Sequence, residues 1–174
     1  LVFVQFGLCI SMGRNLTDRD TRTTNLLFMC YAAVTGFTFS TLFAVYGTGT
    51  LVGAFAFTSV LFFSMAIIGH TTNVDISRFS GLLMGGLIAL LITTVVSMFI
   101  PALRSSLLIS YLGIIVFLGL TAWDMQRIKQ IYYQTGGYGT AAENLAVYGA
   151  FELYLDFLNI FLYVLRILGT SRDN

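Results

Sequence analysis

Three acidic residues lie in stretches of sequence that are otherwise strongly hydrophobic. They are Asp124, Glu152 and Asp156, whereas the other five acidic residues fall in polar stretches or at the C-terminus. A carboxylate at the centre of a bilayer costs about 2.5 to 3.5 kcal/mol on insertion scales, so it faces the interior of the protein or a water-filled cavity. Such groups usually have a function, and these three are the first candidate site residues.

The last hydrophobic segment carries a stripe of polar residues. They recur at steps of four, four, three, four and three: Tyr148, Glu152, Asp156, Asn159, Tyr163 and Arg166. This spacing places all of them on one face of a helix, and the rest of that helix is apolar, so we expect it to be central. Asn159 and Tyr163 would line a pathway and Arg166 would supply a counter-charge. Polar contacts between helices are the structural alternative for Asp156 and Arg166.

Asp124 ends the preceding hydrophobic segment, and two interpretations of it are open. It could pair with Arg127, one turn later, or it could meet Asp156 inside the protein. Two carboxylates about 4 Å apart repel each other by roughly 4 kcal/mol at an effective dielectric of 20, so the pair loses its protons in two separate steps. Glu152 adds a third charge one turn from Asp156. The group is a candidate proton sensor, and when ionised a tentative calcium site through Asp124 and Asp156.

The composition indicates a membrane protein. Hydrophobic residues make up 57% of the 174 residues, charged residues only 10%, and the mean hydropathy is +0.85. Soluble domains typically carry about 25% charged residues, so the expected surroundings are a lipid bilayer. The net charge is only +1 and the basic residues are scattered, which argues against nucleic acid as a partner. A single histidine excludes a histidine-based zinc site, and we expect no cofactor.

The hydrophobic blocks predict an all-α bundle that forms one domain over residues 1–174. About 20 apolar residues span a bilayer. We predict segments near 1–13, 25–46, 49–70, 81–103, 107–124 and 143–169, with the polar stretches between them as loops. The first segment reads as truncated, with a helix missing before it. The spacings Gly49–Gly53 and Gly81–Gly85 predict close helix packing.

The basic residues predict an orientation. With alternating segments, one side collects six of them and the other side collects three. The richer side is expected to be cytoplasmic, which puts the C-terminus outside. The six are Arg14, Arg19, Arg22, Arg78, Arg127 and Lys129.

Three stretches resemble the transmembrane Bax-inhibitor-motif family, especially its bacterial members. They are Thr121-Ala-Trp-Asp-Met-Gln-Arg-Ile-Lys129, Leu153-Tyr-Leu-Asp-Phe-Leu-Asn-Ile-Phe161 and Leu165-Arg-Ile-Leu-Gly169, and the resemblance covers almost the whole chain. It implies seven helices, six around a central last one, in a bacterial plasma membrane. It also implies a pH-sensitive calcium leak controlled by two aspartates, which match Asp124 and Asp156.

The resemblance also implies basic partners and shows departures. An arginine that latches one aspartate matches Arg14 most closely, and Arg166 matches an arginine near the end of the last helix. Trp123 replaces a usual tyrosine, Gln5 stands where some relatives have an acid, and Glu152 takes a place that is often small or neutral. The gating pH could differ as a result.

Two other function classes compete with a leak channel. An intramembrane aspartyl protease also needs two membrane aspartates, but Asp156 follows Leu153-Tyr-Leu155 and lacks the Gly-x-Gly turn that would open a helix for substrate. We therefore expect no enzymatic activity. A non-conducting regulator that binds membrane proteins, such as proteases or cell-death proteins, also fits the resemblance, and the sequence leaves the oligomeric state open.

Overall fold

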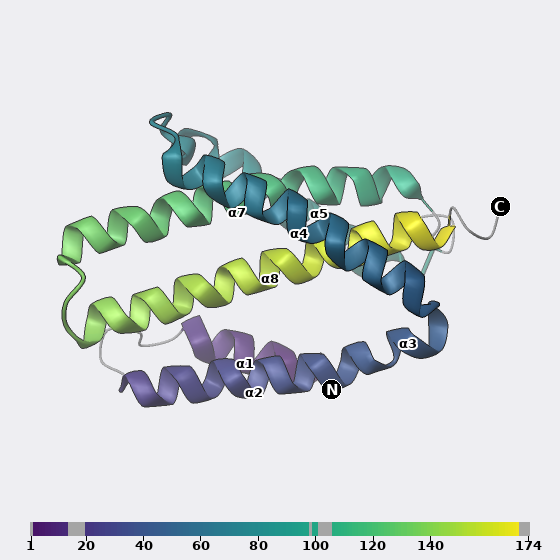
Figure 1. The fold of residues 1–174 in the computed structure, drawn as a ribbon, viewed down its shortest axis with the longest axis horizontal. Helices are drawn as coiled ribbons and strands as arrows, with labels where there is room; N and C mark the ends of the chain where they lie inside the picture. Colours follow the sequence, from purple (N-terminus) through teal and green to yellow (C-terminus); the bar gives the residue numbers. More distant parts are fainter. Residues whose placement is uncertain (1, 14–19, 98, 101–105, 171–174) are drawn as a thin grey trace.

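The chain is helical throughout the described part of the computed structural model, which covers residues 2–13, 20–97, 99–100 and 106–170 apart from short connections. No strand occurs in these ranges, so the predicted all-α class is confirmed (Figure 1). The elements are α1 Val2–Gly13, α2 Thr21–Ser40, α3 Leu42–Val45, α4 Thr48–Thr71, η1 Ile76–Phe79, α5 Ser80–Ser97, α7 Leu107–Thr135 and α8 Thr140–Thr170.

The outer surface of the bundle suits lipid. Among the described residues, four stretches are long and apolar enough to cross a membrane: Thr21–Val45, Thr48–Thr71, Ile76–Ser97 and Leu107–Thr135. Large apolar side chains such as Phe43, Val60 and Leu82 are mostly exposed on them. Exposing these side chains to water would be unfavourable, whereas exposing them to lipid hydrocarbon is not. The chain is therefore a multi-pass membrane protein.

Helix α8 is central, as the polar stripe predicted. It packs against α2, α4 and α7, and in Figure 1 it crosses the middle of the bundle between α2 and α7. Its buried face includes Phe151 and Ile160, which are 1% and 0% exposed. The buried core that α8 shares with α4, α5 and α7 comprises Leu51, Ala54, Leu90, Phe117, Leu120, Ile160, Phe161, Val164 and Leu165.

Helix α7 is longer than the hydrophobic segment that predicted it. We expected a loop from Arg127 onward, but the helix continues to Thr135 and ends where Gly136 takes a left-handed conformation, at φ 65°. The prediction was wrong because only membrane-length hydrophobicity was counted. The polar extension keeps helical hydrogen bonds outside the hydrocarbon, and Gly136 and Gly137, both at positive φ, stop it.

The expected glycine contacts are also corrected. A Cβ on Gly53, Gly81 or Gly85 would meet nothing within 4 Å, so these glycines are not where helices approach closely. The close approach between α4 and α7 is instead at Gly69, where a Cβ would collide with the backbone of Ala122. Small-residue spacing identifies a candidate face, but it does not say which face is turned towards another helix.

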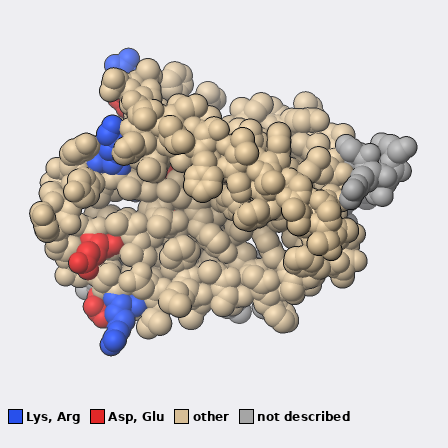
Figure 2. All heavy atoms as spheres, viewed as in Figure 1, with Lys and Arg blue, Asp and Glu red and all other residues tan. Residues whose placement is uncertain are grey.

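Charged side chains gather at one end of the molecule (Figure 2), where α2 begins and where α7 is joined to α8. The α4–η1 connection is anchored there by α7. The Gln126 side chain accepts a hydrogen bond from the Ile76 amide at 2.9 Å and donates to the Val74 carbonyl at 2.8 Å. Lys129 Nζ donates to the carbonyl oxygen of His70 at 2.8 Å. The end of α7 therefore organises this connection.

Candidate proton-sensing site

Asp124 of α7 and Asp156 of α8 meet inside the bundle. The two helices lie side by side, and the carboxyl groups are 7% and 4% exposed. Their side chains lie close enough to interact with each other, and Asp156 also lies beside the side chain of Thr121. Two carboxyl groups can share a hydrogen bond only when one of them keeps a proton. Of the two interpretations of Asp124, the structure shows the encounter with Asp156.

One oxygen of Asp156 has no hydrogen-bond partner among the described residues. Its Oδ2 atom is buried and accepts no hydrogen bond from any described residue. A buried acceptor without a donor is unfavourable, and in native proteins it often marks a functional group. Oδ2 is thus free to accept a proton or to contact a cation that reaches this depth.

Glu152 pairs with Arg127, across the α7–α8 interface. Arg127 Nη1 lies 3.2 Å from Oε1 and 3.3 Å from Oε2 of Glu152. The Arg127 side chain is 41% exposed and the Glu152 side chain is 22% exposed. The Tyr148 side chain, one turn earlier on α8, also contacts Glu152. The basic residue that could have served Asp124 therefore binds Glu152 instead. The positive charge of Arg127 partly offsets the negative charge of Glu152, and both charges act on the neighbouring Asp124.

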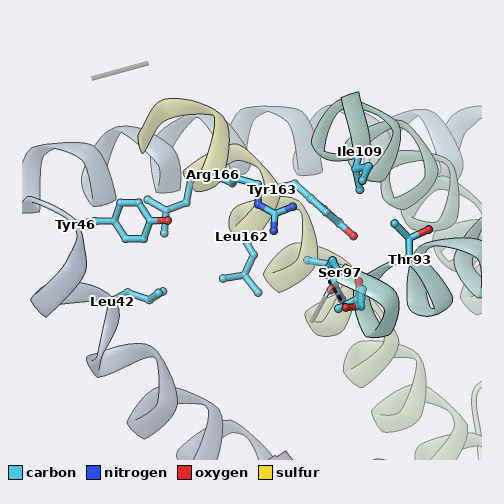
Figure 3. A pocket seen from close by; sticks show the side chains of 11 residues that line it. Leu42, Tyr46, Thr93, Ser97, Ile109, Leu162, Tyr163 and Arg166 are labelled. Atoms are coloured by element: carbon cyan, nitrogen blue, oxygen red, sulfur yellow. Dashed lines mark hydrogen bonds between the residues drawn. The ribbon is translucent and has the colours of Figure 1, made fainter. Parts of the chain in front are cut away.

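The structure does not bring Arg166 to the aspartates. Arg166 is ten residues beyond Asp156 on α8, about 15 Å at 1.5 Å per residue. Together with Asn159 and Tyr163 it lines a separate cavity of about 330 Å³ (Figure 3). Arg14, the other expected counter-charge, lies outside the described residues. Asp124, Asp156 and Glu152 are thus the predicted site residues that come together.

A permanent metal site is not formed by these residues. In the described part of the chain, no group of three or more His, Cys, Asp or Glu side chains could hold a metal ion. Calcium takes six to eight oxygen ligands, and two aspartates supply at most four. Two aspartate side chains alone would leave most of the coordination shell of a calcium ion to water.

Sequence reasoning missed Gln126 and the Arg127–Glu152 ion pair. The two partners of that pair are 25 residues apart, on different helices, so no local spacing reveals it. One available signal was the polar pattern of residues 124–130, which continues the helical phase of α7 beyond the hydrophobic segment.

Comparison with known proteins places this site in a family. The model of the family described as "Inhibitor of apoptosis-promoting Bax1" matches residues 1–173. The chain belongs to the Bax inhibitor family. In this member of the Bax inhibitor family, Asp156 lies on the central last helix, α8, and Asp124 lies on α7 beside it.

Three relatives illustrate the match. A protein of Borreliella burgdorferi is 36% identical over the whole chain, which covers 75% of the relative. Inner membrane protein YbhL of Escherichia coli K12 is 35% identical over 99% of the chain and 74% of its own length. A membrane protein of Streptococcus pyogenes serotype M3 is 37% identical over 83% of the chain and 62% of its own length. The Escherichia coli and Streptococcus pyogenes relatives in this Bax inhibitor comparison are named for the membrane.

Proposed function

We propose that this Bax inhibitor family member is a pH-sensitive calcium leak channel of a bacterial inner membrane, with Asp124 and Asp156 as its proton sensor. The observation that carries the proposal is the contact between two buried carboxyl groups on adjacent helices, α7 and α8. The inner membrane location is supported by the printed name of the Escherichia coli relative. No catalysis and no cofactor form part of the proposal.

The sensor works through the bond between α7 and α8. While the pair holds a proton, a hydrogen bond joins the two helices and only one negative charge is present. When that proton leaves, the hydrogen bond is lost and two like charges face each other in a poorly solvated place. The repulsion is roughly 4 kcal/mol at 4 Å and an effective dielectric of 20, enough to shift a conformational equilibrium about a thousandfold. The relative position of α7 and α8 therefore depends on pH.

The same carboxylates suit the ion that passes. Oxygen ligands with full negative charge are what calcium prefers, and Asp156 Oδ2 has no hydrogen-bond partner among the described residues. Arg127 offsets part of the charge of Glu152, whose carboxylate adds to the negative field at the aspartates. A site of two carboxylates binds too weakly to trap calcium, which suits conduction rather than storage.

Calcium entry into liposomes tests the proposal. The purified chain is reconstituted with a calcium indicator inside, calcium is added outside, and the initial rate is followed from mildly acidic to mildly alkaline pH. We expect a rate above that of protein-free liposomes that changes with pH. A rate equal to that of protein-free liposomes at every pH would reject conduction and favour a non-conducting regulator.

A further inference from the structure

The cavity around Arg166 lies at the other end of α8 from the charged cluster and is not used by the proposed sensor. Described residues of α3, α5, α7 and α8 contribute to its wall, together with Tyr46. In Figure 3 the guanidinium of Arg166 projects into it, with Tyr46 on one side and Tyr163 on the other. Arg166 also lines a second cavity of about 310 Å³ beside Gly47 and Thr50. Arg166 therefore lines two hollows, and Tyr46 lines both of them as well.

The Arg166 charge has no recorded carboxylate partner among the described residues. The ion pair found in these ranges is that of Arg127 with Glu152. The nearest described acid along α8 is Asp156, ten residues away. Arg166 is half-buried, and proteins keep a half-buried positive charge against water, a partner or a ligand. An arginine presents five N–H donors in a planar fork that fits phosphate oxygens.

Tyr46 and Tyr163, the two tyrosines beside Arg166, pack closely against glycines. A Cβ on Gly169 would collide with the ring of Tyr46, and one on Gly113 would collide with the ring of Tyr163. The Tyr163 hydroxyl also contacts the side chain of Thr94. The absence of a side chain at each glycine lets a ring lie flat against a helix, so the walls of the cavity are built by specific packing.

An apolar hollow of about 250 Å³ adjoins this cavity, because Leu42 lines both. The rest of its lining is apolar and comes from α2, α3, α4 and α8: Phe39, Phe43, Leu51, Val52, Phe55 and Phe161. Val52 and Phe43 are 62% and 67% exposed on its rim, towards the expected lipid. A ligand that spans both hollows would carry an anionic group at one end and a hydrocarbon chain at the other.

We propose that this composite cavity binds an anionic phospholipid, with its phosphate on Arg166 between Tyr46 and Tyr163 and an acyl chain in the hollow of Phe43, Val52 and Phe161. Charge complementarity selects an anionic lipid over a zwitterionic one, whose choline or ethanolamine nitrogen would meet the arginine's field. The apolar hollow selects a lipid over a free phosphate ion. This inference does not depend on whether the protein conducts calcium.

Thermal unfolding in a neutral detergent tests the proposal. Unfolding is followed through the fluorescence of Trp123, the single tryptophan, which packs on the core. Three additions are compared: short-chain phosphatidylglycerol, phosphatidylcholine with the same chains, and inorganic phosphate. A ligand that binds only the folded state raises Tm as its concentration rises. We expect phosphatidylglycerol to raise Tm by several degrees and the other two to raise it much less.

Variants assign the effect to the cavity. Arg166→Gln should abolish the shift from phosphatidylglycerol, and Val52→Trp, which fills the apolar hollow but keeps the charge, should reduce it. Arg78→Gln at the opposite end is the matched control and should keep the full shift. Asp173→Asn should also keep the full Tm shift. If phosphatidylglycerol raised Tm in Asp173→Asn but not in the wild type, the Asp173 carboxylate would be the partner of Arg166 and the proposal would be rejected.

Other outcomes overturn the proposal directly. Equal shifts from phosphatidylglycerol and phosphatidylcholine would remove the charge argument, and an equal shift from inorganic phosphate would leave a small-anion site without a lipid. If Arg166→Gln does not fold, Arg166→Lys replaces it, with lipid retained through purification measured by native mass spectrometry. An unchanged amount of bound phosphatidylglycerol in Arg166→Lys and Val52→Trp together would contradict the assignment.

Discussion

Arg127 on α7 donates to both carboxylate oxygens of Glu152 on α8, at 3.2 and 3.3 Å. This ion pair lies one helical turn from Asp124 along α7 and one turn from Asp156 along α8. It joins the same two helices and partly offsets the charge of Glu152, which still acts on both aspartates. The polar interior has two parts, a neutralised ion pair and a pair of carboxyl groups that can exchange protons.

The first prediction concerns this ion pair. Arg127→Gln and Glu152→Gln should each lower the stability of the protein, because each leaves the other charge without a partner. The double variant should lose less stability than the sum of the losses in the two single variants. We expect a coupling of about 0.5 to 1 kcal/mol, since both side chains are partly exposed and the pair is screened. Thermal unfolding of the four proteins measures it, and strictly additive losses would contradict the pairing.

The second prediction concerns Gln126, which is buried and bonds two backbone groups of the α4–η1 connection. Gln126→Ala should leave the Ile76 amide and the Val74 carbonyl without these partners, at a cost of about 1 to 3 kcal/mol. Limited proteolysis should then cut the connection faster. Gln130→Ala, an exposed position on the same helix, is the control. Equal cleavage rates in both variants would show that Gln126 does not hold the connection.

The third prediction concerns the α4–α7 crossing at Gly69. Gly69→Ala places a Cβ against the backbone of Ala122, which cannot move aside as a side chain could. Overpacking of this kind typically costs about 1 to 3 kcal/mol. Gly53→Ala on the same helix meets open space and should leave Tm unchanged or slightly raised. A Tm for Gly69→Ala equal to that of Gly53→Ala would place the crossing elsewhere.

The fourth prediction is a gain of stability. The Thr58 hydroxyl on α4 is buried at 0% exposure and makes no hydrogen bond with any described residue. Thr58→Val keeps the shape and removes the unsatisfied group, which should stabilise the protein by about 1 kcal/mol. In Thr71→Val the lost hydroxyl is one that donates to the Ile67 carbonyl, so no gain is expected. A lower Tm for Thr58→Val would mean that this hydroxyl has a partner such as water.

The sequence predicted the hydrophobic elements well because the length of a membrane helix is set by the bilayer. For Asp124 the sequence left two partners open, Arg127 and Asp156, because the spacing along one helix cannot say which neighbouring helix its side chain faces. It did not predict that α7 continues to Thr135, because polar helical turns outside the membrane leave no hydropathy signal. The ion pair between Arg127 and Glu152 could not be predicted either, because it depends on how the two helices are rotated relative to each other.

The most direct test of the account is the pH dependence of calcium entry in Asp124→Asn and Asp156→Asn, with Asp75→Asn as the control in a connecting segment. An amide keeps the shape of the carboxyl group but cannot take part in a shared titration, so each sensor variant loses one half of the coupled pair. We predict a rate that varies with pH in the wild type and in Asp75→Asn, and a flattened or displaced profile in both sensor variants. Wild-type profiles in Asp124→Asn and Asp156→Asn would contradict the paired-aspartate sensor.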